Sequence, residues 1–291
     1  THVIDTSGAY IPGHGTPTVM LFGRNRDPKL DTVRAALGIR GEPSTPEDPA
    51  NAKVWSSIRD HLDQPGFEND FITVADKKRE LFEEHPWSLR GGGVLEAKGQ
   101  LSQVTVRIKG LVDSIGFASF PGQDDAFVYP GDLPRRFGFP PEFTREYATG
   151  ETVRSWSYNA QERALAPYNT PDELAELHPS DRWGRFLWLF RERILSTTSF
   201  GGNTRKDLDE DFWAWYRWIP ARYEVPFRIT FAEVATHNHF VLDRGGKVFN
   251  QTAPVIKLPE EADEDDHLEL LGPLNSSTGC FWMKQIFYAK G

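Results

Sequence analysis

Proline and glycine set the firmest limits on how this chain can fold, and both are dense between residues 130 and 143. This stretch reads PGDLPRRFGFPPEF, with four prolines and two glycines in fourteen residues. Proline removes a backbone hydrogen-bond donor and is excluded from the interior of helices and central strands. The stretch therefore predicts a division of the chain into a front part and a rear part.

The length and composition indicate a packed globular protein. The chain has 291 residues, of which 38% are hydrophobic and 13% are aromatic, enough for one large domain or two ordinary ones. No apolar run approaches the roughly 18 residues of a membrane span, and no charged-then-apolar signal segment opens the chain. The first residue is Thr, and the final YAKG directly follows an apolar helical pattern, so we expect a piece of a longer protein.

The single cysteine, Cys280, excludes an internal disulfide framework and favours a reducing cytoplasm. It lies in STGCFWMKQI, an apolar helical pattern without a neighbouring base, which favours a buried structural thiol over a nucleophile.

Hydrophobic periodicity predicts helices and strands in irregular order. The expected strands span residues 3–5, 18–22 (buried), 71–74, 227–235, 238–249 (a hairpin turning at DRGG) and 253–259. The expected helices span residues 28–39, 51–66, 76–89, 94–113, 180–198, 209–223 and 267–289. Because βαβ units do not repeat regularly, the fold class is α+β.

Net charge is −9, which taken alone argues against nucleic acid as a partner. The charge is unevenly distributed, however. The run EEADEDDHLE, residues 260–269, predicts a solvated acidic loop. Arg182 to Arg228 carries nine Lys or Arg against six acids, an excess of three, and several tryptophans fall in the same segment.

Motifs for other chemistries are weak. RGGGVLEAKG is a glycine cluster before a helix, but no strand precedes it as a dinucleotide loop requires. His237 and His239 would share a strand face, yet no third metal ligand accompanies them. Asp124 and Asp125 are adjacent rather than arranged across a glycosidase cleft. We assign no catalytic residue and no metal, and His14 receives no role.

Arginine interleaved with aromatics is the remaining signal, in RWGRFLWLFRER and RKDLDEDFWAWYRWIPARYEVPFR. Such a combination suits phosphate contacts and stacking on bases. The alternative is that the aromatic residues form core and the arginines its solvated face.

Several segments, in the same order along the chain, resemble PglX-like adenine-specific DNA methyltransferases of BREX phage-defence systems, which are related to type IIG-style restriction–modification methyltransferases. DTSGAYIPGHGTPTVMLFGRNR resembles the end of their catalytic domain, and HPWSLRGGGVLEAKGQL resembles the segment that leads out of it. IGFASFPGQDDAFVYP resembles the strand motif that opens their target-recognition region. GETVRSWSYNAQERALAPYN matches its G-x-x-V-R-x-W … PY pattern. FAEVATHNHFVLDRGGKVFNQTAPVIKLP and LLGPLNSSTGCFWMKQ match its hairpin and its final helix.

The resemblance implies three parts: residues 1–24 as the last strands of a methyltransferase sheet, 25–100 as a connecting region, and 101–291 as an incomplete target-recognition domain. It also implies S-adenosylmethionine (SAM) as cofactor of the full-length enzyme, bound upstream of this chain. The family's SAM-binding glycine motif and its Asn/Asp-Pro-Pro-Tyr/Phe motif do not occur in this sequence, since FPPEF lacks the leading Asn or Asp. This chain alone would therefore recognise DNA without methylating it.

Double-stranded DNA is the implied partner, with other BREX proteins as a further possibility. Arg205 and Lys206 follow SFGGNT, a glycine loop expected to be flexible enough to approach a groove. The candidate DNA contacts are Arg182, Arg185, Arg191, Arg193, Asn203, Arg205, Lys206, Arg217, Arg222, Arg244 and Lys247. A protein-interaction module of a defence complex and a free-standing hydrolase remain the alternatives.

Overall fold

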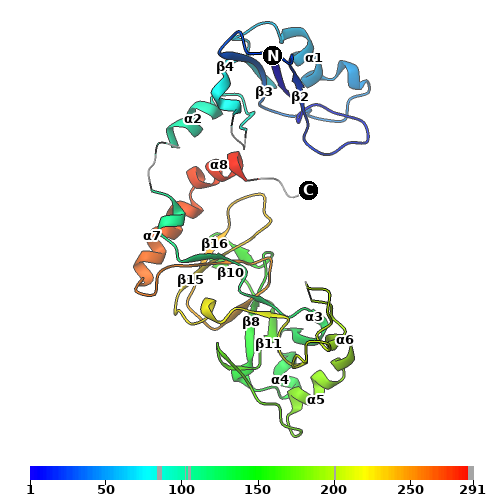
Figure 1. The fold of residues 1–291 in the computed structure, drawn as a ribbon, viewed down its shortest axis with the longest axis vertical. Helices are drawn as coiled ribbons and strands as arrows, with labels where there is room; N and C mark the ends of the chain where they lie inside the picture. Colours follow the sequence, from blue (N-terminus) through cyan, green and yellow to red (C-terminus); the bar gives the residue numbers. More distant parts are fainter. Residues whose placement is uncertain (84–86, 102, 104–105, 200, 288–291) are drawn as a thin grey trace. The chain divides into compact units, whose positions relative to one another are not determined.

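The computed structural model describes residues 1–83, 87–101, 103, 106–199 and 201–287 as a mixed α/β protein with several sheets (Figure 1). The chain divides into two compact units. The first unit is Thr1–Thr105 with Trp282–Gly291, and the second unit is Val106–Phe281. Some residues of the expected elements lie outside the described residues. They are residues 288–289 at the end of the last expected helix, Ser102 of the helix expected over 94–113, His85 and Pro86 of a quoted segment, and Phe200 of the glycine loop.

The first unit is built on one four-stranded sheet in the order β2-β1-β3-β4. Its strands are β1 His2–Asp5, β2 Val19–Phe22, β3 Thr32–Gly38 and β4 Ile72–Lys78. β1 pairs antiparallel with β2 and parallel with β3, and β3 pairs antiparallel with β4. Helix α1, Lys53–His61, packs its apolar side chains Val54 and Ile58 on this sheet. The unit also holds helix α2, Val94–Leu101, and short 3-10 helices at Pro49–Asn51 and Arg79–Phe82.

Strands from residues 1–24 and 25–100 therefore share one sheet, so the division between the compact units falls at 105/106 and not at 24/25. Both strands expected in the first 24 residues are present. The second is not buried as predicted, because β2 is an edge strand, with Leu21 56% exposed and Phe22 54% exposed.

The predicted helix over residues 28–39 is wrong, because that segment is β3. Val33 and Ala35 to Leu37 are all buried, since β1 and β4 flank β3 in the sheet and the strand is covered on both faces. A strand buried on both faces loses the alternation that distinguishes it from a helix. The predicted helix starting at Asp76 is also wrong, because β4 runs through Asp76, whose carboxylate pairs with Arg34 on β3 at 2.6 Å.

The second unit contains two four-stranded sheets. One has the order β17-β8-β11-β7, from Lys247–Phe249, Thr144–Ala148, Glu162–Leu165 and Val128–Pro130. The other has the order β16-β15-β18-β5, from Phe240–Asp243, Arg228–Phe231, Val255–Lys257 and Ser114–Gly116. Three two-stranded pairs complete it: β9 Val153–Arg154 with β10 Ser157–Tyr158, β12 Tyr168–Thr170 with β13 Glu173–Leu174, and β6 Ser119–Phe120 with β14 Arg217–Trp218.

The proline-rich stretch 130–143 does not divide the chain, because it lies inside the second unit as the connection from β7 to β8. It contains helix α4, Leu133–Phe137, with Pro134 in the first turn, where a missing N–H costs nothing. Gly138 ends this helix at a φ of +71°, a left-handed conformation that glycine adopts without strain.

The predicted hairpin at DRGG is also wrong. β16 pairs with β15, whereas β17 leaves that sheet and pairs in parallel with β8. Gly245 and Gly246, at φ of +93° and +82°, allow the chain to turn from one sheet to the other.

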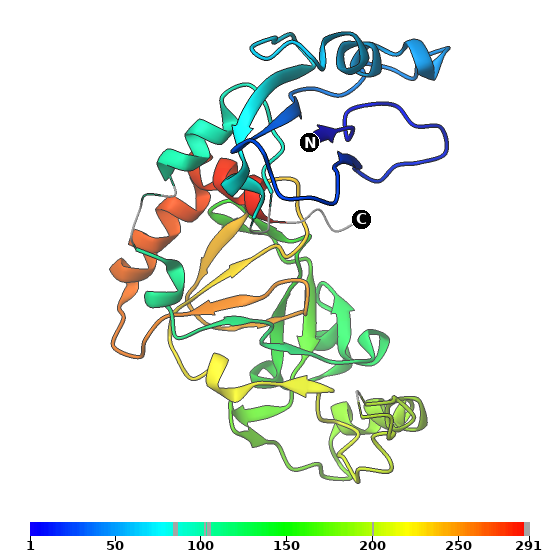
Figure 2. The ribbon, with the colours of Figure 1, turned by 45° about the horizontal axis from the view of Figure 1, so that its top comes forward.

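The remaining helices of the second unit include α3 Asp124–Phe127 and α7 Glu264–Asn275, and α8 spans Ser277–Ile286. Part of the acidic run 260–269 is the start of α7, not a loop. Asp263 and Asp266 form a reciprocal capping box there, and negative charge is favourable at a helix N-terminus. Helix α7 lies along β16 and β15 (Figure 2), with His267, Leu271 and Leu274 buried. No described helix is long and apolar enough to cross a membrane. Cys280 on α8 is half-buried.

Candidate functional site

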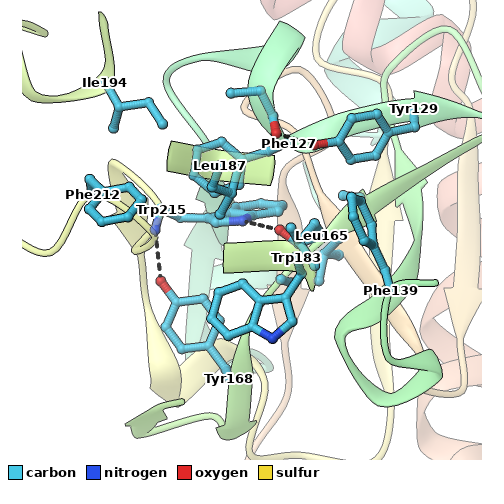
Figure 3. Packing of buried hydrophobic residues seen from close by; sticks show 14 of the residues in the cluster. Phe127, Tyr129, Phe139, Leu165, Tyr168, Trp183, Leu187, Ile194, Phe212 and Trp215 are labelled. Atoms are coloured by element: carbon cyan, nitrogen blue, oxygen red, sulfur yellow. Dashed lines mark hydrogen bonds between the residues drawn. The ribbon is translucent and has the colours of Figure 1, made fainter. Parts of the chain in front are cut away.

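The aromatic residues of the segment 182–228 form the main core of the second unit (Figure 3). The predicted single helix over 180–198 is two short helices, α5 Arg182–Trp188 and α6 Arg191–Leu195, which bury Trp183, Leu187 and Ile194. The alternative weighed from the sequence, aromatic residues as core, is therefore correct for most of these side chains. The main exception is Trp188, which is 60% exposed.

Trp215 lies inside this core and is tied to two strands. Its indole Nε1 donates to the Leu165 carbonyl at 2.9 Å, and its backbone N–H donates to the Tyr168 hydroxyl at 3.0 Å (Figure 3). Burial raises the pKa of Tyr168 to about 12, so this hydroxyl stays neutral at physiological pH.

Arg205 is buried, contrary to the prediction that it contacts DNA. The residue is 1% exposed, and its guanidinium pairs with the Glu210 carboxylate at 2.8 Å. It also donates to the carbonyls of Asp211 and Ala214 at 2.9 and 3.0 Å. The Asp211 carbonyl also accepts from the Ala214 N–H at 3.1 Å, in a turn. The second helix predicted over 209–223 does not form. In its place stand turns, β14 and a 3-10 helix at Pro220–Arg222.

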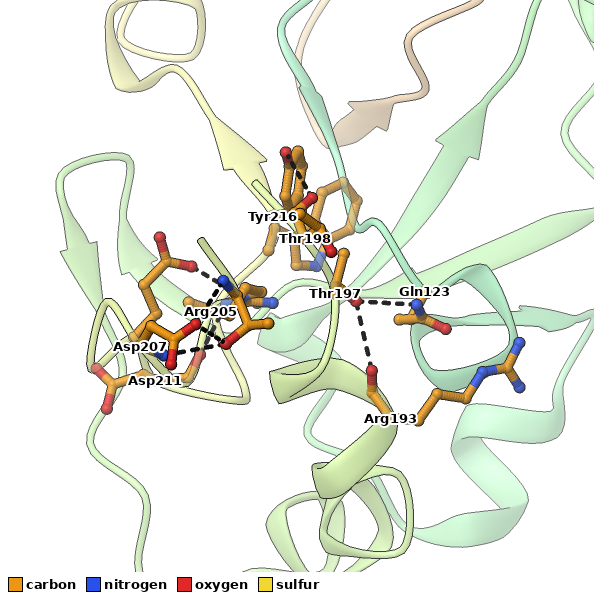
Figure 4. Close-up of polar contacts among 12 residues, drawn as sticks. Gln123, Arg193, Thr197, Thr198, Arg205, Asp207, Asp211 and Tyr216 are labelled. Atoms are coloured by element: carbon orange, nitrogen blue, oxygen red, sulfur yellow. Dashed lines mark hydrogen bonds and ion pairs between the residues drawn. The ribbon is translucent and has the colours of Figure 1, made fainter. Parts of the chain in front are cut away.

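The glycine loop after α6 is anchored at its base. Arg205 N–H donates to the Thr197 carbonyl and Lys206 N–H to the Leu195 carbonyl, each at 3.0 Å. Gln123 Nε2 donates to Thr197 Oγ1 at 3.0 Å (Figure 4). Asp125 pairs with Arg193 at 3.0 Å. The GQDDAF motif thus meets the basic segment. Because hydrogen bonds fix the base of the loop, they also fix the position of Asn203 and Lys206, which are both exposed.

Arg222 also has a structural role instead of the predicted DNA contact. Its guanidinium donates to the carbonyls of Gly116 and Val255 at 3.1 and 3.2 Å, on neighbouring strands β5 and β18. Burial lowers the pKa of Arg222 from its ordinary value.

Four other predicted contacts are exposed to different degrees but already paired. Arg191 pairs with Glu192 and lies 5.1 Å over the Trp188 ring, and Arg193 pairs with Asp125. Arg244 pairs with Glu264 at 2.6 Å, and Lys247 pairs with the buried Asp243 at 2.9 Å. DNA would have to compete with these carboxylates.

Five of the predicted residues expose their side chains: Arg182, Arg185, Asn203, Lys206 and Arg217. Arg182 and Arg185 are three residues apart on α5, so they are neighbours on one helix face. Trp183, Gly184 and Leu187 of the same helix are buried, which orients the two arginines away from the core.

A surface hollow of about 390 Å³ is lined by Arg205, by Asp209, Glu210 and Asp211, and by residues 214–218. Burial, then the charge of Asp209, raises the pKa of Asp211. Three carboxylates and two guanidinium groups, those of Arg205 and Arg217, thus line the hollow.

Metal and two-carboxylate chemistry gain no support from the described residues. Among them, no group of three or more His, Cys, Asp or Glu side chains could hold a metal ion. His239 Nδ1 lies 3.2 Å from Ser155 Oγ, and Asp124 and Asp125 are consecutive residues at the start of α3.

Two segments that carried the family resemblance meet at one backbone residue, Phe240, at the start of β16. Trp156, in the turn between β9 and β10, donates its N–H to the Phe240 carbonyl at 3.0 Å. Asn275, in the LNSS stretch at the end of α7, donates to the same carbonyl at 2.8 Å and accepts from the Phe240 N–H at 3.1 Å. Residue-level reasoning from the sequence did not single out Trp156. The sequence feature that could have indicated this residue is a tryptophan within a polar turn, Arg154–Ser157.

The fold is similar to that of part of a restriction–modification enzyme. No protein-family model matches the chain. The type IIL restriction–modification enzyme MmeI, solved in complex with DNA, is similar with a TM-score of 0.50 and 12% identity, over 99% of this chain and 32% of that chain. The type IIG restriction endonuclease BpuSI has a TM-score of 0.40 and 11% identity, over 95% of this chain and 33% of that chain.

In sequence, the chain is 38% identical over 296 aligned residues to the adenine-specific methyltransferase PglX of Streptomyces coelicolor (strain ATCC BAA-471 / A3(2) / M145). The alignment covers all of this chain and 24% of PglX, so the chain spans about a quarter of that relative's length. The chain is therefore similar to about a quarter of PglX, and the resemblance predicted from its sequence is confirmed.

Proposed function

We propose that this chain is the DNA-recognition part of a site-specific DNA adenine-N6 methyltransferase that acts in BREX-type phage defence. The observation that carries the proposal is the 38% identity to PglX along the whole chain. The similarity of fold to part of MmeI is consistent with it, because MmeI was solved in complex with DNA.

SAM would be bound by other parts of the full-length protein. The glycine turn Gly91–Gly93 does not fit it, because the Gly91 N–H donates to the Gly38 carbonyl at 2.9 Å. In the described residues 87–90, just before the turn, the strand-like pairing is a single bridge between Arg90 and Gly38. We therefore assign no methyl-transfer step to these residues. Their proposed task is to hold and read the duplex while a base leaves the stack for a pocket elsewhere.

The proposed DNA face is limited to the exposed residues Arg182, Arg185, Asn203, Lys206 and Arg217. Arg182 and Arg185 supply phosphate contacts from a rigid helix. Asn203 offers an amide of the kind that pairs with adenine in a groove. Arg205 has a positioning role, because it fixes the base of the loop that carries Asn203 and Lys206.

Methyl transfer tests the proposal directly. The full-length protein, incubated with labelled SAM and duplex DNA, is expected to form N6-methyladenine at one recurring sequence, read by mass spectrometry and sequencing. Absence of methyladenine under conditions where the protein is folded and binds SAM would sink the proposal.

Reversing the charge of both helix arginines, R182E/R185E in the full-length protein, is expected to weaken duplex binding at least tenfold at about 100 mM salt. Two lost phosphate contacts should also reduce the slope of log affinity against log salt by about 2. Fluorescence anisotropy over a salt series measures both quantities.

The matched control is K29E/K53E, which makes the same change in net charge at two exposed lysines of the first unit. It should leave the salt slope unchanged. Equal affinity and equal slope in R182E/R185E and the wild type would remove α5 from the DNA face.

A protein-docking role is the second candidate, favoured by one observation. Trp188 and Leu189, at the end of α5, are 60% and 76% exposed. Large exposed apolar side chains mark protein interfaces when they form a contiguous patch. If W188A left DNA binding intact but released another component of a purified defence complex, this role would stand beside DNA recognition.

A further inference from the structure

The turn between β9 and β10 places a large aromatic ring where hairpin turns take glycine or asparagine. Ser155 and Trp156 form this two-residue turn, and Trp156 has a φ of +65°. Its side chain is nevertheless 57% exposed. A bulky residue in a left-handed conformation is a backbone outlier, and such strain persists only where the surroundings impose it.

The surroundings do impose the conformation. The Trp156 N–H is held by the Phe240 carbonyl, and Asn275 in turn fixes both backbone groups of Phe240. Val153, at the start of the hairpin, is fully buried in a core cluster of the second unit. These contacts therefore fix the conformation of the turn without a ligand. Burial of the Trp156 ring contributes little to its stability, because the residue is 57% exposed.

The residues next to Trp156 in the turn, Arg154 and Ser155, are polar or basic and make polar contacts. Arg154 is exposed, and its Nη1 donates to the carbonyls of Val153 and Gly150 at 2.7 and 3.4 Å. Ser155 Oγ contacts Asn238 and His239 on the adjacent loop at 3.2 Å. The pKa of His239 is lowered, first by burial and then by the positive charges of Arg154 and His237. Arg154 thus places a positive charge next to the turn.

We propose that Trp156 is a nucleobase-stacking residue, whose ring packs on a base of bound duplex DNA while Arg154 faces an adjacent phosphate. The inference rests on the proposed function and deepens it by naming a second DNA-contacting element apart from α5. An exposed ring that follows an exposed arginine by two residues suits a base next to a phosphate. A protein partner would instead require a continuous apolar patch around the ring.

The strain offers a test that separates function from folding. Glycine adopts a positive φ freely, so W156G should fold with an unchanged or higher melting temperature. In the full-length protein the same variant should bind its duplex about tenfold more weakly, within the range measured for loss of one base-stacking contact. W156F keeps a stacking ring and should retain most of the affinity.

Base analogues give the direct readout. Duplexes with 2-aminopurine at successive positions should show a fluorescence change on wild-type binding at one position, and W156G should lose that change. F22A removes a comparably exposed aromatic ring, 54% exposed, from the edge strand β2 of the first unit and should behave as the wild type in both assays.

The outcomes distinguish the two proposals. If W156G binds and perturbs 2-aminopurine like the wild type while R182E/R185E binds weakly, the stacking role is wrong and the DNA face on α5 stands. A different result would overturn the inference: a lower melting temperature for W156G together with a lower duplex affinity for W156F. The ring would then have a structural role. A wild-type protein that does not bind duplex DNA overturns both proposals.

Discussion

Replacing Asp243 by alanine is expected to lower the free energy of unfolding by about 3–5 kcal/mol, the typical cost of removing one partner of a buried ion pair. Asp243 is 1% exposed and stands directly opposite Arg228 on the neighbouring strand β15. Its Oδ2 lies 2.9 Å from Arg228 Nε, and its Oδ1 lies 2.9 Å from Lys247 Nζ. One carboxylate therefore compensates two cations.

Without that carboxylate, the Arg228 guanidinium stays buried with too few partners. It retains a hydrogen bond to the Arg222 carbonyl at 2.9 Å and the ring faces of Tyr223 and Phe249, at 5.6 and 5.8 Å. These contacts stabilise a cation less than a carboxylate does in a low-dielectric interior. Asparagine should rescue little, because it restores shape without charge.

The matched control for D243A is E146A. Glu146 on β8 is also paired with an arginine on the neighbouring strand, Arg163 on β11. Their charged groups are 3.8 Å apart, however, and both side chains are more than 40% exposed. An exposed pair of this kind contributes less than about 1 kcal/mol. Urea unfolding of the full-length protein, followed by tryptophan fluorescence, compares the two; similar losses in both variants would show that burial of Asp243 is not decisive.

The Asp243 pair also shows what sequence reasoning could not supply. Arg228 counted among the basic residues that suggested DNA binding, yet its charge is neutralised inside the protein by a residue fifteen positions away. Arg205 and Arg222 were likewise counted as contacts and are bound to carbonyl groups. A one-dimensional charge count cannot separate an arginine that faces solvent from one that holds two segments together.

Some elements set by local signals were predicted correctly. Helix α1 follows from its own apolar spacing and from Pro65 and Gly66 after it, and the strand expected at 3–5 is present as His2–Asp5. The single helix expected over 267–289 is instead two helices, α7 and α8, in the described residues. β3 was missed because its flanking strands come from both sides of it in the sequence, and only their pairing makes it a strand. The family resemblance, confirmed by the PglX similarity, drew on the order of many motifs and was less affected by such local errors.

The two proposed DNA-contacting elements illustrate the same limit. Arg182 and Arg185 could be found from the sequence, because their exposure follows from the apolar stripe on the other side of one helix. Trp156 could not, since tryptophan is not expected in a turn that requires a positive φ. Its position depends on Phe240 and Asn275, which are 84 and 119 residues further along the chain.

The largest packing effect is expected for Trp215, where W215A should cost about 3–5 kcal/mol, as for other buried aromatic residues cut to alanine. Trp215 is 4% exposed and has ring contacts with Phe127, Tyr147 and Trp218. Its loss also leaves the Leu165 carbonyl without the indole donor. W215F should be intermediate, because it refills part of the volume without the hydrogen bond.

The effect of W215A should extend to DNA binding, and this links the core to the proposed function. The carbonyl of Ala214, the residue before Trp215, accepts from Arg205, and Arg205 fixes the base of the loop that presents Asn203 and Lys206. Repacking around residue 215 would displace the Ala214 carbonyl and weaken its hydrogen bond with Arg205. Duplex affinity should therefore fall even at temperatures where the variant is folded. W188A, at an exposed tryptophan whose ring lies 5.5 Å from that of Phe212, should lose less than about 1 kcal/mol. If W215A lost stability but bound DNA as the wild type does, the loop after α6 would not depend on this core, and its place on the DNA face would be wrong.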